Sequence, residues 1–236
     1  MKAVWYEQNG GAEVLEDGDM PDPQPGPGEV RVRVITAGVN PSDWKRRQGL
    51  TNRIEFPRVI PNQDGGGVID AVGSGIDQSR IGERVWLFES QFGRAFGTGA
   101  EYTVQPSGHA VRLPDNTGFA AAAGLGVPAM TAHRCVFSDG PVTGKTVLVT
   151  GRAGAVGHYA VQLAKLGGAE VISTVSSDEK AQIAREAGAG HTVNYREGET
   201  AEKIMEVTGG AGVDLVVEVD MAANFAVSQQ VLTRSG

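Results

Sequence analysis

Cysteine is almost missing from this chain of 236 residues, and so are long apolar runs. The single cysteine, Cys135, excludes an internal disulfide, so nothing indicates an oxidising compartment. No stretch approaches the ~18 apolar residues of a membrane-spanning helix, and the N-terminus lacks the pattern of a signal peptide. We therefore expect a cytoplasmic protein with no membrane partner.

An excess of positive charge is also missing. Lys and Arg number 21 against 28 Asp and Glu, which gives a net charge of −7. Nucleic acids and anionic membranes reward clustered Lys and Arg, so we expect neither partner. Apolar residues make up 40% of the chain, and Gly and Pro together stay below the ~25–30% typical of low-complexity chains. The composition predicts a globular protein with a sizeable core.

The first half of the chain is predicted to be rich in short strands. Residues 30–34 alternate Val with Arg, which is the pattern of a half-buried strand. The segment 21–28 is so rich in Pro and Gly that we expect an extended surface loop. Pro128 should divide the helical segment 119–137 or kink it. Further strands are expected at 67–72, 84–88 and 101–104, and a short helix at 44–48.

Strands and helices alternate regularly after Gly140. We expect strands at 145–150, 170–174, 191–193 and 213–219, and helices at 155–166, 178–187, 199–207 and 223–233. Four such units in a row predict a parallel sheet with helices on both faces, which makes the fold class α/β. Ser176 as N-cap and Glu179 three residues later fit a capping box for the second helix.

This predicted sheet is incomplete. A doubly wound dinucleotide-binding sheet has the strand order 3-2-1-4-5-6, and strands 1 to 4 alone precede Gly236. The apolar strand 213–219 would become an unprotected edge, which natural proteins usually avoid. We therefore expect a fragment or an incompletely traced chain, with a naturally short variant as the alternative.

Three glycines follow the first strand of this sheet and precede a helix. Gly154 would let the main chain approach a pyrophosphate, and Gly157 would let the helix pack closely on the sheet. The helix N-terminus adds unpaired N–H groups and a positive dipole end. With Gly151 the spacing is G-x-x-G-x-x-G rather than G-x-G-x-x-G. The alternative is that these glycines serve only a tight turn.

The end of the second strand indicates which dinucleotide would bind. A carboxylate there would accept hydrogen bonds from a free ribose 2′-hydroxyl, but the first acid is Asp178, expected inside the helix. Ser176 can donate to a phosphate and Lys180 can supply positive charge. These residues favour NADP(H) over NAD(H). The alternative for Lys180 is a solvated helix residue.

Several motifs together resemble a known family. They are residues 38–43 (GVNPSD), 64–68 (DGGGV), 72–73 (VG), 82–85 (GERV), 99–102 (GAEY), 128–132, the glycine turn and 193–195 (VNY). The chain resembles the zinc-independent medium-chain dehydrogenase/reductases, specifically NADPH:quinone reductases of the zeta-crystallin type. The resemblance implies a GroES-like, β-rich catalytic domain over 1–125 and a Rossmann-type NADP-binding domain over 126–236. It also implies a homodimer when the protein is full length.

The same resemblance implies which residues hold the cofactor. Thr131 would hold the nicotinamide carboxamide, and Asn224 would lie near the cofactor. Lys45 would lie beside it, where many relatives have Tyr, and Arg152 occupies a position that is usually small. The pyrophosphate would lie at Ala153, Gly154, Ala155, Val156 and Gly157, and the adenosine 2′-phosphate near Ser176, Lys180 and Tyr195.

A zinc ion is not expected. Zinc-dependent relatives carry Cys at the position of Asn40 and a His-Glu pair at Gln63 and Asp64, and zinc prefers thiolate and imidazole ligands. Without a metal, hydride transfer needs alignment and donors that stabilise the oxygen on which charge develops. Asn40 and Lys45 are the candidates for that catalytic role. The alternatives are an N-cap or turn role for Asn40 and a solvated charge for Lys45.

The combined expectation is a zinc-independent oxidoreductase that transfers a hydride from NADPH to a small-molecule quinone. An alternative within the same fold is reduction of a 2-alkenal or another enone. From a different class, the alternative is a non-catalytic, crystallin-like protein that binds the nucleotide without turnover.

Overall fold

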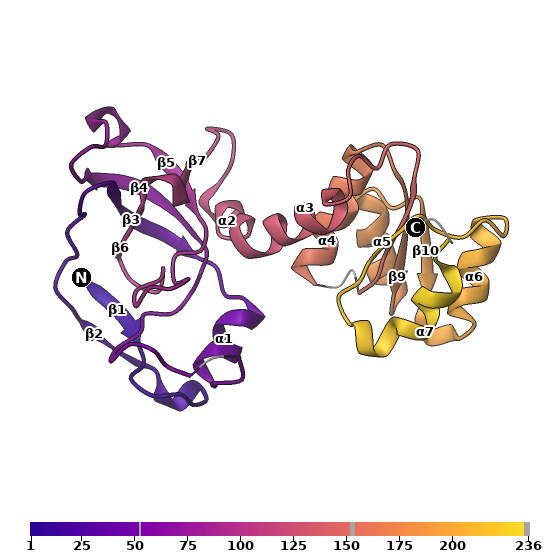
Figure 1. Ribbon diagram of the computed structural model, residues 1–236, viewed down its shortest axis with the longest axis horizontal. Coiled ribbons are helices and arrows are strands. Elements are labelled where there is room, and N and C mark those ends of the chain that lie inside the picture. The colour runs from indigo at the N-terminus through magenta and orange to yellow at the C-terminus, as the bar shows by residue number, and fades with distance from the viewer. Residues whose placement is uncertain (52, 152–153, 234–236) are drawn as a thin grey trace. The chain divides into compact units, whose positions relative to one another are not determined.

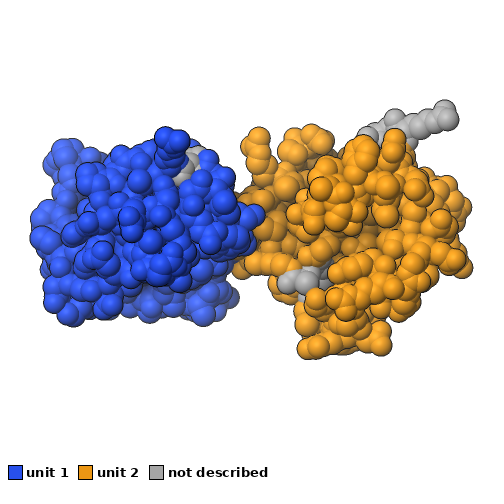
Figure 2. Space-filling view, turned by 90° about the horizontal axis from the view of Figure 1, so that it is seen from below, with its two compact units in different colours: residues 1–127 blue, residues 128–236 orange. Residues whose placement is uncertain are grey.

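The chain forms two compact units, Met1–Val127 and Pro128–Gly236 (Figure 2). They are seen in a computed structural model that describes residues 1–51, 53–151 and 154–233. The first unit ends at Val127, whereas the sequence predicted a domain boundary after residue 125.

The first unit is built on an antiparallel sheet of five strands in the order β6-β3-β4-β5-β7 (Figure 1). Val30 and Val32 of β3 are buried, while Arg31 and Arg33 between them are not, so the predicted alternation is confirmed. A separate antiparallel pair joins β1 to β2. The strands are β1 (Lys2–Trp5), β2 (Glu16–Asp19), β3 (Glu29–Ala37), β4 (Gly65–Val72), β5 (Arg84–Leu87), β6 (Tyr102–Pro106) and β7 (Ala110–Arg112).

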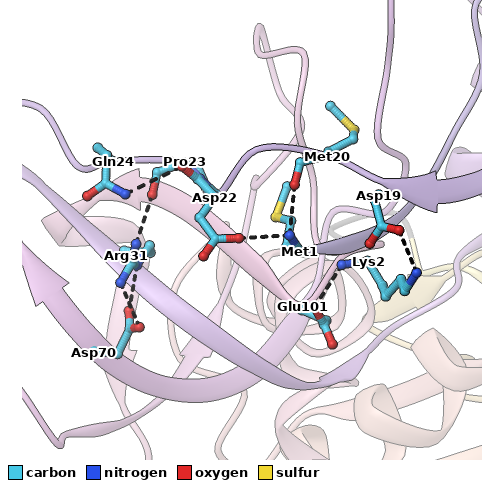
Figure 3. Close-up of polar contacts among 10 residues, drawn as sticks. All are labelled: Met1, Lys2, Asp19, Met20, Asp22, Pro23, Gln24, Arg31, Asp70 and Glu101. Atoms are coloured by element: carbon cyan, nitrogen blue, oxygen red, sulfur yellow. Dashed lines mark hydrogen bonds and ion pairs between the residues drawn. The ribbon is translucent and has the colours of Figure 1, made fainter.

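Strands β1, β2 and β7 were not predicted from the sequence. β2 reads Glu-Asp-Gly-Asp, which has no apolar period, and it is a strand because β1 pairs with it. Polar contacts hold this pair in place (Figure 3): Lys2 Nζ lies 2.7 Å from Asp19 Oδ2, and the amino group of Met1 donates to the Met20 carbonyl at 2.7 Å and to Asp22 Oδ1 at 2.8 Å. Pairing of distant segments decided this structure, and local propensity did not.

Short helical segments complete the first unit and lead into the second, to which α3 (Met130–Phe137) belongs. α1 (Pro41–Arg47) begins with proline at its first position, where the missing N–H costs nothing, and α2 (Phe119–Ala122) packs on β4. A π-helical turn (Leu125–Ala129) contains Pro128, and α3 follows it. The predicted interruption at Pro128 is therefore confirmed. The segment 21–26 has no regular structure, as expected for the Pro-rich loop.

The second unit is a parallel sheet in the order β10-β9-β8-β11. Numbered by their appearance in this unit, the strands follow the order 3-2-1-4, so the predicted doubly wound topology is confirmed. The elements are β8 (Thr146–Val149), α4 (Ala155–Leu166), β9 (Glu170–Val175), α5 (Asp178–Glu186), β10 (His191–Asn194), α6 (Thr200–Val207), β11 (Leu215–Val217) and α7 (Met221–Val231).

Two hydrophobic cores lie on opposite faces of this sheet. Val147 and Val149 of β8 pack with residues of α3, α4 and α5, whereas Leu148 between them packs with residues of α6 and α7. Successive side chains of a strand point to opposite faces, so a run of apolar residues is buried on both sides. This arrangement brings the carboxyl ends of all four strands to one edge of the sheet.

Candidate functional site

The glycine turn follows β8 directly. Gly151 has φ of +59°, and a Cβ there would lie 2.2 Å from Val219 Cγ2, so this position requires glycine. Arg152 and Ala153 lie outside the described residues. Gly154 is the N-cap of α4 in an extended conformation, and no described side chain caps that helix. Among the described residues, the nearest atom to a Cβ on Gly154 would be 3.9 Å away, which leaves room for a ligand on that side of the main chain.

The first turn of α4 consists of Ala155, Val156 and Gly157. Gly157 is buried within the unit, in agreement with close packing of the helix on the sheet. A helix of twelve residues presents its first N–H groups and its positive dipole end at this turn. An anionic group placed above Gly154 would therefore meet donors and favourable charge together.

Ser176 and Lys180 form a polar pair at the carboxyl end of β9. Ser176 is buried, and Lys180 Nζ donates to its hydroxyl at 2.8 Å. The predicted capping box is wrong: the N-cap of α5 is Ser177, whose hydroxyl accepts from the Lys180 N–H at 3.3 Å, and Glu179 is therefore the second helical residue instead of the third. One residue of extra strand leaves Ser176 outside the helix. Asp178 is the first helical residue, as expected, and lies beyond the strand end.

The remaining residues predicted to contact the cofactor lie on separate elements. Tyr195 follows β10 and is 48% exposed. Thr131 is exposed in the first turn of α3. Asn224 lies in the first turn of α7, and its Nδ2 donates to Glu218 Oε1 at 2.9 Å. Tyr195 and Asn224 therefore follow the outer strands β10 and β11 of the sheet.

Glu218 was missed by the sequence reasoning. It comes directly after β11 and accepts hydrogen bonds from Thr150 Oγ1 at 2.7 Å and from the Asp220 N–H at 2.7 Å, as well as from Asn224. The available signal was a carboxylate near the end of the predicted strand 213–219, after the apolar residues 215–217. That segment was interpreted only as a strand, and Glu218 was not related to the glycine turn.

In the first unit, Asn40 lies in a buried polar cluster. Its Nδ2 donates to Asp64 Oδ2 at 3.0 Å, and its N–H donates to Asp43 Oδ2 at 2.7 Å. Asn40 is the N-cap of α1, so the alternative interpretation as a cap describes its place in the fold. Asp64 Oδ2 also accepts from the Val127 N–H at 2.8 Å. Carboxylates of this cluster therefore hold both the side chain and the main chain of Asn40.

Both carboxyl groups of this cluster are poorly solvated. Burial raises the pKa of Asp64 to about 6, although hydrogen bonds from Val127 and Asn40 oppose this shift. Burial also raises the pKa of Asp43 above its ordinary value. Asp64 is fully buried, and its Oδ1 has no hydrogen-bond partner among the described residues. Lys45, by contrast, is exposed, with its Nζ 5.7 Å from the centre of the Trp44 ring.

Comparison with known proteins identifies the family. Residues 26–115 match the alcohol dehydrogenase GroES-like domain, and residues 155–236 match a domain described as zinc-binding dehydrogenase. The chain is 31% identical over 240 residues to the quinone oxidoreductase of Rattus norvegicus, which covers all of this chain and 71% of that protein. The chain belongs to the quinone oxidoreductase family of medium-chain dehydrogenase/reductases.

Two further relatives of this family bear on the site. The structure of Escherichia coli quinone oxidoreductase complexed with NADPH superimposes with a TM-score of 0.87 at 29% identity, covering all of this chain and 71% of that one. A 2-haloacrylate reductase from a Burkholderia species is 34% identical over 199 residues, which is 82% of this chain and 59% of that protein. The GroES-like and Rossmann-type expectations for the two units are thus confirmed.

The zinc ligands of other medium-chain dehydrogenases do not fit the residues present here. The nitrogen of the Asn40 amide is a donor with no lone pair for a metal, and it is engaged with Asp64. The Gln63 side-chain oxygen accepts from the Gln91 N–H at 3.2 Å. The chemistry of Asn40 and Gln63 therefore agrees with the zinc-independent branch of the family. Within the described ranges no group of three or more His, Cys, Asp or Glu side chains could hold a metal ion.

No helix in the described ranges is long and apolar enough to cross a membrane.

Proposed function

We propose that this protein is an NADPH:quinone oxidoreductase that works without zinc. The observation that carries the proposal is the Lys180–Ser176 pair at the end of β9, the strand that pairs with β8, after which the glycine turn begins. A cation and a hydroxyl there, with no carboxylate, suit a 2′-phosphate and not a free 2′-hydroxyl. The quinone oxidoreductase relatives, one of them complexed with NADPH, supply the reaction.

In this proposal each residue has a defined task. Lys180 and Ser176 bind the 2′-phosphate, and the N–H groups of Ala155, Val156 and Gly157 bind the pyrophosphate at the α4 N-terminus. Tyr195, Thr131 and Asn224 line the remainder of the dinucleotide site. When bound, the reduced nicotinamide supplies the hydride.

The substrate side of the reaction falls to Asn40 and Lys45. The Asn40 amide and the ammonium of Lys45 would donate to the quinone oxygen on which negative charge develops. Because Asp64 and Asp43 engage the side chain and the main chain of Asn40, its amide is held in one orientation before any ligand arrives.

A steady-state assay tests the proposal. NADPH and NADH oxidation are followed at 340 nm with 1,4-benzoquinone and 9,10-phenanthrenequinone as acceptors. We expect turnover with NADPH and a clear preference for it over NADH. Equal kcat/KM values for the two nucleotides would contradict the role of Lys180. Nucleotide binding without oxidation by any acceptor would leave the crystallin-like alternative.

A second candidate reaction is reduction of a polarised carbon–carbon double bond, as in 2-alkenals. The Burkholderia 2-haloacrylate reductase favours it, together with Lys45, whose ammonium could pair with a carboxylate on the substrate. Including 2-hexenal and 2-chloroacrylate as acceptors in the same assay decides between the reactions. Faster turnover with either compound than with the quinones would assign the protein to the reduction of polarised carbon–carbon double bonds instead.

We also propose that the protein works in the cytoplasm as a homodimer. The single cysteine and the acidic composition support the compartment, and the family resemblance supports the dimer. Light scattering on purified protein measures the oligomeric state directly. A monomer at all concentrations tested would contradict the dimer.

A further inference from the structure

The carboxyl ends of β8 and β11 meet at a distinctive place in the sheet. The two strands are neighbours, yet α4, which follows β8, packs on one face and α7, which follows β11, packs on the other. The chain therefore diverges between these strand ends. In open parallel sheets ligands bind in the crevice at such a switch point.

Glu218 ties together the segments that border this crevice. Its Oε1 accepts from Thr150 Oγ1 at 2.7 Å, from the Asp220 N–H at 2.7 Å and from Asn224 Nδ2 at 2.9 Å. Its Oε2 accepts from Ser228 Oγ at 3.4 Å. One carboxylate thus links the end of β8 to the β11–α7 turn and to the first two turns of α7.

This carboxylate stays ionised at neutral pH. Partial burial favours the neutral acid, but the hydrogen bonds donated to Glu218 outweigh it and lower its pKa below the ordinary value. Hydrogen bonds to a charged acceptor are roughly twice as strong as those between neutral groups. The linkage therefore depends on charge as well as on shape.

The glycine turn rests directly on this assembly. Thr150 precedes Gly151, and the missing Cβ of Gly151 is the space that Val219 occupies, with 2.2 Å between that position and Val219 Cγ2. Asp220 in turn caps α7 by accepting from the Ala223 N–H at 3.2 Å. Moving Glu218 would disturb the turns after both strands together.

We propose that Glu218 is a positioning residue for the nicotinamide half of the dinucleotide, a role that rests on the proposed function. Ser176 and Lys180 place the adenosine half at the end of β9, on one side of β8. A dinucleotide that crosses the glycine turn then has its other half at the end of β11. Glu218 acts there through the Thr150 hydroxyl and the Asn224 amide.

Comparing two ligands distinguishes an effect of Glu218 on the nicotinamide half from a general effect on nucleotide binding. Isothermal titration calorimetry compares NADPH with adenosine 2′,5′-bisphosphate, which carries the adenosine and 2′-phosphate and no nicotinamide. Glu218→Ala should weaken NADPH binding by about tenfold, because four hydrogen bonds to its carboxylate are lost, and leave the bisphosphate within about twofold of its original affinity. Glu202→Ala, an exposed carboxylate of α6, is the matched control and should change neither.

Other outcomes would overturn the assignment. Equal losses for the two ligands, or no loss for NADPH, would show that Glu218 does not act on the nicotinamide half. If Glu218→Ala does not fold, Glu218→Gln keeps an oxygen for Thr150 and Asn224 and should show a smaller loss confined to NADPH; a loss shared by both ligands would again count against it. If the unmodified protein binds neither ligand, the proposed function fails first, and this role fails with it.

Discussion

Replacing Asp64 with Asn should change how the stability of the first unit depends on pH. Asp64 is fully buried, and burial raises its pKa from 3.8 to about 6. Asn is neutral at every pH and keeps an oxygen that can accept from Asn40 Nδ2 and from the Val127 N–H. The variant therefore removes a titration and preserves both of these hydrogen bonds.

The expected change in the free energy of unfolding follows from the pKa shift of Asp64. A carboxyl group whose pKa is raised on folding stabilises the folded state below its unfolded pKa, and this contribution is lost as the pH rises through the folded pKa. A shift of about two units corresponds to about 3 kcal/mol, of which about 2 kcal/mol is lost between pH 4.5 and 7.5. Relative to the unmodified protein, Asp64→Asn should gain about that amount over this interval.

The assay can be confined to one unit. All three tryptophans, Trp5, Trp44 and Trp86, belong to the first unit, so fluorescence excited at 295 nm reports its unfolding alone. Urea titrations at half-unit steps of pH give the free energy of unfolding of each variant. Urea is preferred to guanidinium because it leaves charge interactions unscreened.

The test uses the difference in the free energy of unfolding between the two proteins, because carboxyl groups outside the Asn40 cluster contribute equally to both. Asp115→Asn, which removes an exposed carboxylate of the same unit, controls for net charge and should leave the pH dependence parallel to that of the original protein. A constant difference between Asp64→Asn and the original protein from pH 4.5 to 7.5 would refute the reasoning.

Three further variants test other parts of the structure. Lys180→Ala should raise the KM for NADPH by about tenfold and leave that for NADH within about twofold, measured at 340 nm. Gly151→Ala should destabilise the second unit by more than about 2 kcal/mol in thermal melts, because of the 2.2 Å contact and positive φ, whereas Gly108→Ala has no atom within 4 Å and should change little. Asn40→Ala should cost the first unit about 1–2 kcal/mol in urea titrations, through loss of the cap and the Asp64 bond.

Some elements were predictable because their signal is local. The helix Ala155–Leu166 was predicted with its observed bounds, since an apolar strand, a glycine turn and an amphipathic run are adjacent in the sequence. The capping of α5 was misplaced by one residue because Ser176 and Ser177 are chemically alike. β9 continues to Val175, which pairs with Asn194 of β10, so α5 begins after Ser177, and Ser176 is left to accept from Lys180.

Residue patterns alone predicted the alternation of strands and helices in the second unit, the place of the glycine turn and the preference for a phosphorylated nucleotide, because each signal lies within about ten neighbouring positions. Only the tertiary structure joined Glu218 to Thr150, and Asp64 to Asn40 and Val127. Those partners are separated by 68, 24 and 63 positions. Burial and charge are properties of the assembled neighbourhood, so the raised pKa of Asp64 and the lowered pKa of Glu218 arise only when the chain is folded.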